Sequence, residues 1–132
     1  MAEKQLFTAD GHSLMLGSKK QSLIIRWQGE VGRAAFEQLH QRTERWNMHY
    51  GVSQMLCNSQ TAYFNLSTDE QLEMMGTIAR LHNAGLRKIA MVHPKNAAFG
   101  NEAYLLQESA SSIFSVQGFT SEAGALSWLR RS

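Results

Sequence analysis

Short apolar runs with β-strand character alternate with amphipathic helical segments along most of this chain, and this alternation constrains its fold more than any other feature. The clearest strand pattern, residues 88–93, follows a helical segment after a very short turn at Gly85. Parallel strands need a crossover connection, usually a helix. The alternation therefore predicts a largely parallel sheet covered by helices.

The N-terminal third adds an antiparallel element. Two apolar runs, residues 14–16 and 23–27, flank a polar, glycine-containing spacer at 17–21. This arrangement is typical of a β-hairpin. Residues 1–12 are mostly polar and are expected to be a frayed start. Two further strands are expected at residues 54–59 and 113–116.

Four amphipathic segments are expected to be helices. They cover residues 33–46, the segment that begins after Ser67, residues 97–108, and the segment that Thr120 caps. Ser67 and Glu70 have the spacing of a capping box, and Gly85 suits a left-handed helix end. The predicted fold class is α/β, with order ββαβαβαβα. It has a single mixed, mostly parallel sheet of about five strands with an edge β-hairpin, flanked by four main helices.

The composition fits one globular domain spanning residues 1–132. Hydrophobic residues make up 43% of the chain, and only one residue is proline. A chain of this length buries roughly two-thirds of the surface that its unfolded form exposes. The formal net charge is only +2 and the basic residues are scattered, so charge gives no reason to expect a nucleic-acid partner.

The sequence offers no targeting signal and no cross-link. Residues 1–10 lack the apolar core of a signal peptide. No stretch approaches the roughly 18 apolar residues of a spanning helix. Cys57 is alone, so no intrachain disulfide is expected, and it is interpreted as a small buried hydrophobe. The expected location is the cytoplasm.

No recognised catalytic motif is present. The sequence has no dinucleotide fingerprint, no P-loop and no nucleophile elbow. Its five histidines are scattered, without the helical pair that typically holds zinc. We therefore expect no catalytic residues, no metal, no cofactor and no enzymatic activity.

Five residues are candidates for a ligand or partner surface. Ser59 and His93 end predicted strands, where ligands of open α/β sheets bind, although the more ordinary interpretation of His93 is a strand-end histidine hydrogen-bonded to a loop. Met75 belongs to an apolar stripe that is either core or an adaptable groove. Phe99 and Tyr104 lie in a segment that is apolar on more than one side, as in an oligomer interface or a lid.

The C-terminal region resembles a known family. Phe114 is followed by the segments 119–122 and 125–129, with sequences Phe-Thr-Ser-Glu and Ala-Leu-Ser-Trp-Leu. This ending is similar to that of the sporulation stage II AA-like (SpoIIAA-like) family. That family belongs to the sulphate-transporter and anti-sigma-factor-antagonist (STAS) domains. The element order fits the family over nearly the whole chain, and the motif-level likeness covers about its last third.

The resemblance implies a non-enzymatic, cytoplasmic regulatory module that binds a protein partner or itself. Anti-sigma antagonists carry a phosphorylated serine in an Asp-Ser motif followed by glycine. The corresponding residues 58–62 read Asn-Ser-Gln-Thr-Ala, so the phosphorylatable motif is absent. Likeness to lipid-carrying domains implies an alternative role as a carrier or sensor of a small apolar ligand.

Overall fold

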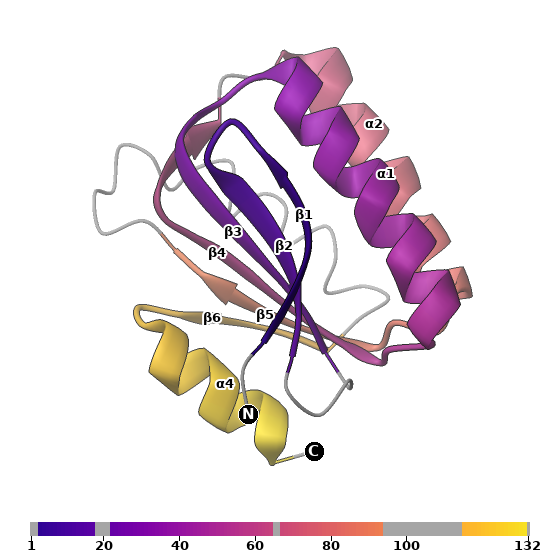
Figure 1. Cartoon of the computed structure of the whole chain (residues 1–132), viewed down its shortest axis with the longest axis vertical. Helices are drawn as coiled ribbons and strands as arrows, with labels where there is room; N and C mark the ends of the chain where they lie inside the picture. The colour runs from indigo at the N-terminus through magenta and orange to yellow at the C-terminus, as the bar shows by residue number, and fades with distance from the viewer. Residues whose placement is uncertain (1–2, 18–21, 65–66, 94–114, 132) are drawn as a thin grey trace.

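The computed structural model describes residues 3–17, 22–64, 67–93 and 115–131 (Figure 1). Within these ranges the strands are β1 (Lys4–Ala9), β2 (His12–Leu16), β3 (Ser22–Val31), β4 (Gln54–Phe64), β5 (Lys88–Val92) and β6 (Ser115–Phe119). The helices described are α1 (Arg33–Tyr50), α2 (Thr68–Asn83) and α4 (Glu122–Arg130).

The described strands form one mixed sheet in the order β1-β2-β3-β4-β5-β6. β1, β2 and β3 are antiparallel neighbours, whereas β3 to β6 run parallel. The α/β fold class, the edge hairpin and the mostly parallel sheet are therefore confirmed. The sheet has six strands rather than five, because residues 4–9, expected to be frayed, form β1. The helix expected at 97–108 lies outside the described residues.

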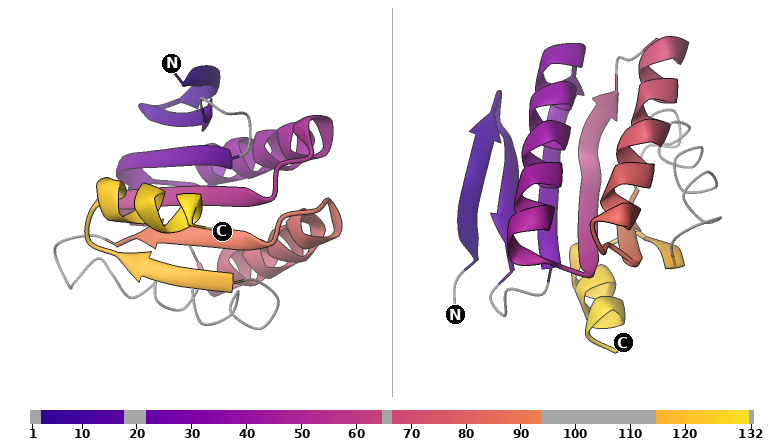
Figure 2. Two further views of the ribbon diagram at one scale, coloured as in Figure 1. Left: turned by 90° about the horizontal axis from the view of Figure 1, so that it is seen from below. Right: turned by 90° about the vertical axis from the view of Figure 1, so that its right-hand side faces the viewer.

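The helices cover both faces of the sheet (Figures 1 and 2). α1 and α2 run side by side over one face, and α4 lies on the other. The larger core cluster includes Leu39 of α1 and Leu81 of α2, packed on Ile25 and Met91 of the sheet. The smaller cluster joins Ala125 and Leu129 of α4 to Ile24, Leu56, Ala90 and Val92.

Local signals end the two long helices, although α1 continues to Tyr50, past the expected end at residue 46. Gly51 adopts a left-handed conformation with φ of 61° and donates to the Asn47 carbonyl oxygen, which ends α1. After α2, the Gly85 N–H donates to His82 O and the Leu86 N–H to Leu81 O. This pair of bonds is the Schellman motif, and the φ of 112° at Gly85 favours glycine.

Several predicted boundaries were wrong. β4 continues to Phe64 instead of ending at residue 59. Its register with β3 shifts between Arg26 and Gln28, and pairing with β3 resumes at Thr61 and extends to Phe64. One extra residue in β4 absorbs the shift, as in a β-bulge. The cap of α4 is Ser121, whose hydroxyl accepts from the Gly124 N–H, and not Thr120. β6, described as Ser115–Phe119, continues past the expected end at residue 116, and residues 113–114 of the expected strand lie outside the described ranges.

Candidate functional site

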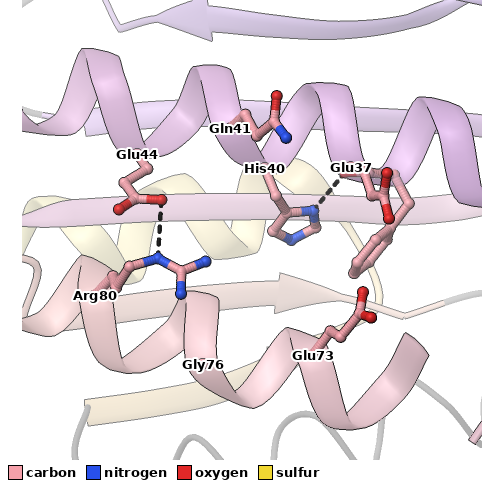
Figure 3. Close-up of a pocket in the computed structure, with 8 residues that line it drawn as sticks. Glu37, His40, Gln41, Glu44, Glu73, Gly76 and Arg80 are labelled. Atoms are coloured by element: carbon pink, nitrogen blue, oxygen red, sulfur yellow. Dashed lines mark hydrogen bonds and ion pairs between the residues drawn. The ribbon is translucent and has the colours of Figure 1, made fainter. Parts of the chain in front are cut away.

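A groove lies between α1 and α2 on the side of these helices that faces away from the sheet (Figure 3). Its volume is about 470 Å³. The described lining residues come from both helices and are Phe36, Glu37, His40, Gln41, Glu44, Glu73, Gly76 and Arg80. They recur at spacings of three and four residues, so each helix contributes one face to the groove.

Two inter-helix ion pairs mark the ends of the groove. Arg80 Nε donates to Glu44 Oε2 at 3.0 Å toward the C-terminal ends of the helices. Near their N-terminal ends, Arg33 Nε donates to Glu37 Oε1 at 2.9 Å within α1. Arg33 also approaches Glu73 of α2, at 4.0 Å. Glu73 is thus the carboxylate held most loosely, and its side chain is 58% exposed.

His40 lies between these ion pairs. Its ring packs on Phe36 at a centroid distance of 4.1 Å and stacks on Trp27 at 5.7 Å. Burial lowers the pKa of His40 to about 4, so the ring is neutral at pH 7. Nδ1 lies 2.9 Å from the Phe36 carbonyl oxygen, which can only accept, so Nδ1 carries the proton. Nε2 is left as an acceptor, and Figure 3 shows it directed into the space between the helices.

Gly76 forms part of the opposite wall. A glycine in the middle of a helix costs about 1 kcal/mol relative to alanine. A Cβ atom at this position would meet only Arg80 Nη1, at 3.5 Å, which is an ordinary contact. The packing of α2 therefore does not require glycine at position 76, and its effect is to widen the groove.

The groove is suited to binding a polar, cationic group. Three carboxylates and one guanidinium line it, beside the neutral His40 ring. The described lining includes no serine, threonine or cysteine that could act as a nucleophile. Across the described ranges, no three His, Cys, Asp or Glu side chains are grouped closely enough to hold a metal ion.

A shallower hollow continues along α1. It is lined by Gln41, Glu44, Arg45, Met48 and His49 and has a volume of about 620 Å³. Met48 is 69% exposed there. The surface beside the groove is therefore partly apolar.

Of the five residues expected to form a ligand or partner surface, only Ser59 and His93 have described side chains, and neither lines the groove. Ser59 is only 3% exposed, and its hydroxyl donates to the Val92 carbonyl oxygen at 3.1 Å. His93 follows directly, is 9% exposed, and donates its backbone N–H to Phe119 O. The sheet thus brings Ser59 and His93 to neighbouring strands, on the interior side of the molecule. Met75 is in α2, but its side chain is outside the description, as are Phe99 and Tyr104.

Sequence reasoning missed the groove. It took residues 33–46 as an amphipathic helix with no site on it and treated His40 as one of the scattered histidines. The signal that could have found it is Gly76, an isolated glycine inside an amphipathic helix, which often has a packing or functional reason. The pairing of α1 with α2 could not be deduced from spacing within either helix.

The predicted cap at the start of α2 is confirmed. The Ser67 hydroxyl accepts from the Glu70 N–H at 3.2 Å, and the Glu70 carboxylate accepts from the Ser67 N–H at 2.9 Å. These bonds lower the pKa of Glu70. The Ser67 hydroxyl and the Glu70 carboxylate are thus both engaged with backbone groups at the start of the helix.

Cys57 is a partly buried side chain, where the sequence predicts a buried small hydrophobe. It packs against the larger core cluster, and burial raises the pKa of its thiol to about 12. At neutral pH it is a thiol rather than a thiolate, which is the reactive form. None of the described helices is both long and apolar enough to cross a membrane.

Comparison with known proteins gives a fold but no sequence relative. No protein family model matches the chain, and no curated protein matches its sequence. A solved structure of the anti-sigma factor antagonist SpoIIAA in its unphosphorylated form is similar, with a TM-score of 0.58 and 14% identity over 98% of both chains.

A second solved structure, of the Bacillus cell fate determinant SpoIIAA in its phosphorylated form, has a TM-score of 0.56 and 15% identity. That match covers 98% of this chain and 100% of the other. The chain therefore has the SpoIIAA-like STAS fold. At this level of identity the likeness establishes the fold alone.

Proposed function

We propose that this chain is a regulatory module that acts by binding another protein and catalyses no reaction. The observation that carries this proposal is the fold likeness to SpoIIAA, which spans 98% of this chain and all or nearly all of the matched chains. One of those structures is described as an anti-sigma factor antagonist and the other as a cell fate determinant. Because a fold does not imply a function, the proposal needs local support.

The groove between α1 and α2 supplies that support. It is open, about 470 Å³ in volume, and lined mainly by charged and polar side chains. The neighbouring exposed Met48 adds apolar surface at its rim. A polar groove with an apolar rim suits a polypeptide better than a lipid-like ligand. Met55 and Met91 are buried in the core at 5% and 4% exposure, so neither offers an exposed apolar side chain to a ligand.

We further propose that Ser59 is not a phosphorylation switch. A kinase must reach the hydroxyl, and Ser59 lies inside β4 with 3% exposure and a hydrogen bond to Val92 O. The absence of an Asp-Ser pair in residues 58–62 agrees with this proposal. Regulation in this chain would then depend on the amount of partner or on another residue. We propose that it takes place in the cytoplasm.

The test is to isolate the protein's complexes from its own cells. A tagged chain is expressed at native level and cross-linked, and its stoichiometric partner is identified, produced separately and titrated against the purified chain by calorimetry. We expect one polypeptide that binds with a micromolar or tighter Kd. If no polypeptide binds on reconstitution, and the purified chain carries an apolar small molecule, the carrier function replaces this proposal.

A further inference from the structure

The geometry of the groove points to an arginine side chain of the partner protein as its occupant. We infer that this side chain enters between α1 and α2, with its guanidinium over the His40 ring and against the carboxylate of Glu73. The inference rests on the proposed function, because it names the chemistry by which the partner is recognised.

The carboxylates that line the groove favour a positively charged occupant. Glu37, Glu44 and Glu73 line the groove, and Arg80 is the only lining residue with a positive charge among those described. Arg80 is engaged with Glu44 at 3.0 Å. Glu73 is approached by Arg33 only at 4.0 Å, the outer limit of an ion pair. A cationic group entering the groove therefore finds a carboxylate that is already in place and poorly neutralised.

The aromatic floor selects the kind of cation. The partly exposed His40 ring lines the groove, and the buried Phe36 ring packs against it at a centroid distance of 4.1 Å. A guanidinium is planar, stacks on aromatic faces and donates in a fork to a carboxylate, whereas an ammonium is a compact, strongly hydrated charge. His40 Nε2 adds an acceptor, because Nδ1 carries the proton that bonds Phe36 O. Burial keeps this ring uncharged at neutral pH, so it does not repel the cation.

Gly76 leaves space in the groove for the arginine side chain of the partner. Gly76 lines the groove on α2, the helix across from His40 (Figure 3). Its packing does not require glycine, since an added Cβ would make one ordinary contact. Glycine is used where another group must approach the backbone closely. A groove of about 470 Å³ exceeds what an arginine side chain fills, so neighbouring residues of the partner can enter with it.

The test uses small probes that do not depend on the partner's identity. Three blocked amino acids, N-acetyl-arginine, N-acetyl-lysine and N-acetyl-citrulline N-methylamides, are titrated into the isotope-labelled chain. The His40 ring and Gly76 amide signals are followed by NMR. We expect saturable shifts with arginine at millimolar concentration, at least fivefold weaker binding of lysine, and none with the neutral citrulline probe. Equal responses to all three probes, or no shift with arginine, would overturn the inference.

Paired variants locate the site. Gly76→Met should abolish arginine binding, while Ala79→Met adds the same side chain at an exposed position of α2 and should leave binding unchanged. Glu73→Gln should weaken binding by roughly fivefold to tenfold, the effect of one charge-assisted hydrogen bond at a partly exposed site. Asp69→Asn removes a carboxylate from the same helix outside the groove and is its control. Unfolding measurements confirm that all four variants are folded.

The inference and the proposed function fail in different ways. If a reconstituted protein partner binds Gly76→Met as tightly as the unmodified chain, the function stands and the arginine site is wrong. If the arginine probe binds in the groove but no protein partner exists, the site stands and the function is wrong.

Discussion

Arg26 and Glu122 form a two-pronged ion pair that joins strand β3 to the first turn of α4. Arg26 Nε donates to Glu122 Oε1 at 2.8 Å, and Nη2 donates to Oε2 at 3.0 Å. Asn58 donates to the same Oε1 at 3.0 Å, and Arg26 also bonds Glu3. This network lies beside the smaller core cluster, so it fixes where α4 begins on the sheet.

Replacing Glu122 tests that anchoring. The hydrogen bond from Arg26, with a smaller contribution from that of Asn58, lowers the pKa of Glu122. Since the folded-state pKa lies below the unfolded value, the stabilisation is present above the unfolded value and is lost as the pH falls through the folded value. Glu122→Gln should lower the free energy of unfolding by about 1 kcal/mol at pH 7, because the pair is partly exposed.

Urea denaturation at pH 7 and at pH 3 measures this effect. The difference between Glu122→Gln and the unmodified chain should shrink at pH 3, where the glutamate approaches its neutral form. Glu73→Gln serves as the control for loss of one negative charge, because the Glu73 side chain is 58% exposed on α2, away from this network. A difference of the same size at both pH values would contradict the ion-pair account.

The sequence predicts the parts of the fold that depend on local chemistry. Ser67 and Glu70 are close neighbours in the chain, and Gly85 follows α2 almost directly, so both ends of that helix are readable from nearby residues. The Arg26–Glu122 pair joins residues 96 positions apart, and no local sequence pattern predicts it. The same holds for the groove, since Glu44 and Arg80 meet only because α1 and α2 lie side by side.

Strand β1 escaped prediction for a different reason. An edge strand pairs on one side only and needs little apolar character, so a polar segment with a single Leu6-Phe7 pair sufficed. Both side chains pack against the larger core cluster, and Arg42 of α1 lies 4.8 Å from the centre of the Phe7 ring. β1 is therefore stabilised partly by its contact with α1, which the sequence of β1 alone does not predict.

Ser67→Ala should destabilise the protein without altering partner binding. The variant removes the hydroxyl that accepts from the Glu70 N–H at 3.2 Å. Loss of such a cap costs about 0.5–2 kcal/mol. Chemical denaturation and partner titration on the same preparation measure both properties. Unchanged stability with altered binding, or phosphate on Ser67 in protein from its own cells, would show that Ser67 is a switch instead.

Trp128→Ala should weaken the docking of α4. Trp128 is partly buried and packs against the smaller core cluster, and its ring centroid lies 5.7 Å from that of Phe119. Lys88 Nζ sits 4.1 Å from the ring centre. Full truncation of a buried tryptophan costs about 3–5 kcal/mol, so we expect roughly half of that for this half-buried ring. An unchanged denaturation midpoint would rule out an anchoring role.

His40 should make stability depend on pH. Its folded-state pKa of about 4 lies below the usual 6.5, because burial disfavours the charged ring. The unfolded chain therefore binds a proton first, and stability is full above about pH 6.5 and falls as the pH drops toward 4. Burial also lowers the pKa of His12, so both histidines contribute. His40→Phe keeps the stacking on Trp27 and removes one titrating group.

Unfolding at pH 7, 5.5 and 4 compares the two proteins. The unmodified chain should lose stability relative to His40→Phe as the pH falls, and an NMR titration of the His40 ring should give a pKa of about 4. A measured pKa at the usual value of 6.5 would mean that the ring is solvated. The interpretation of His40 as a buried, neutral ring in the groove would then be wrong.

Native mass spectrometry of the chain purified gently from its own cells tests whether the chain acts by binding another protein. We expect a complex of this chain with another polypeptide, and no small-molecule adduct on the chain released from that complex. A chain that carries an apolar small molecule and has no polypeptide partner would contradict the proposed protein-binding function.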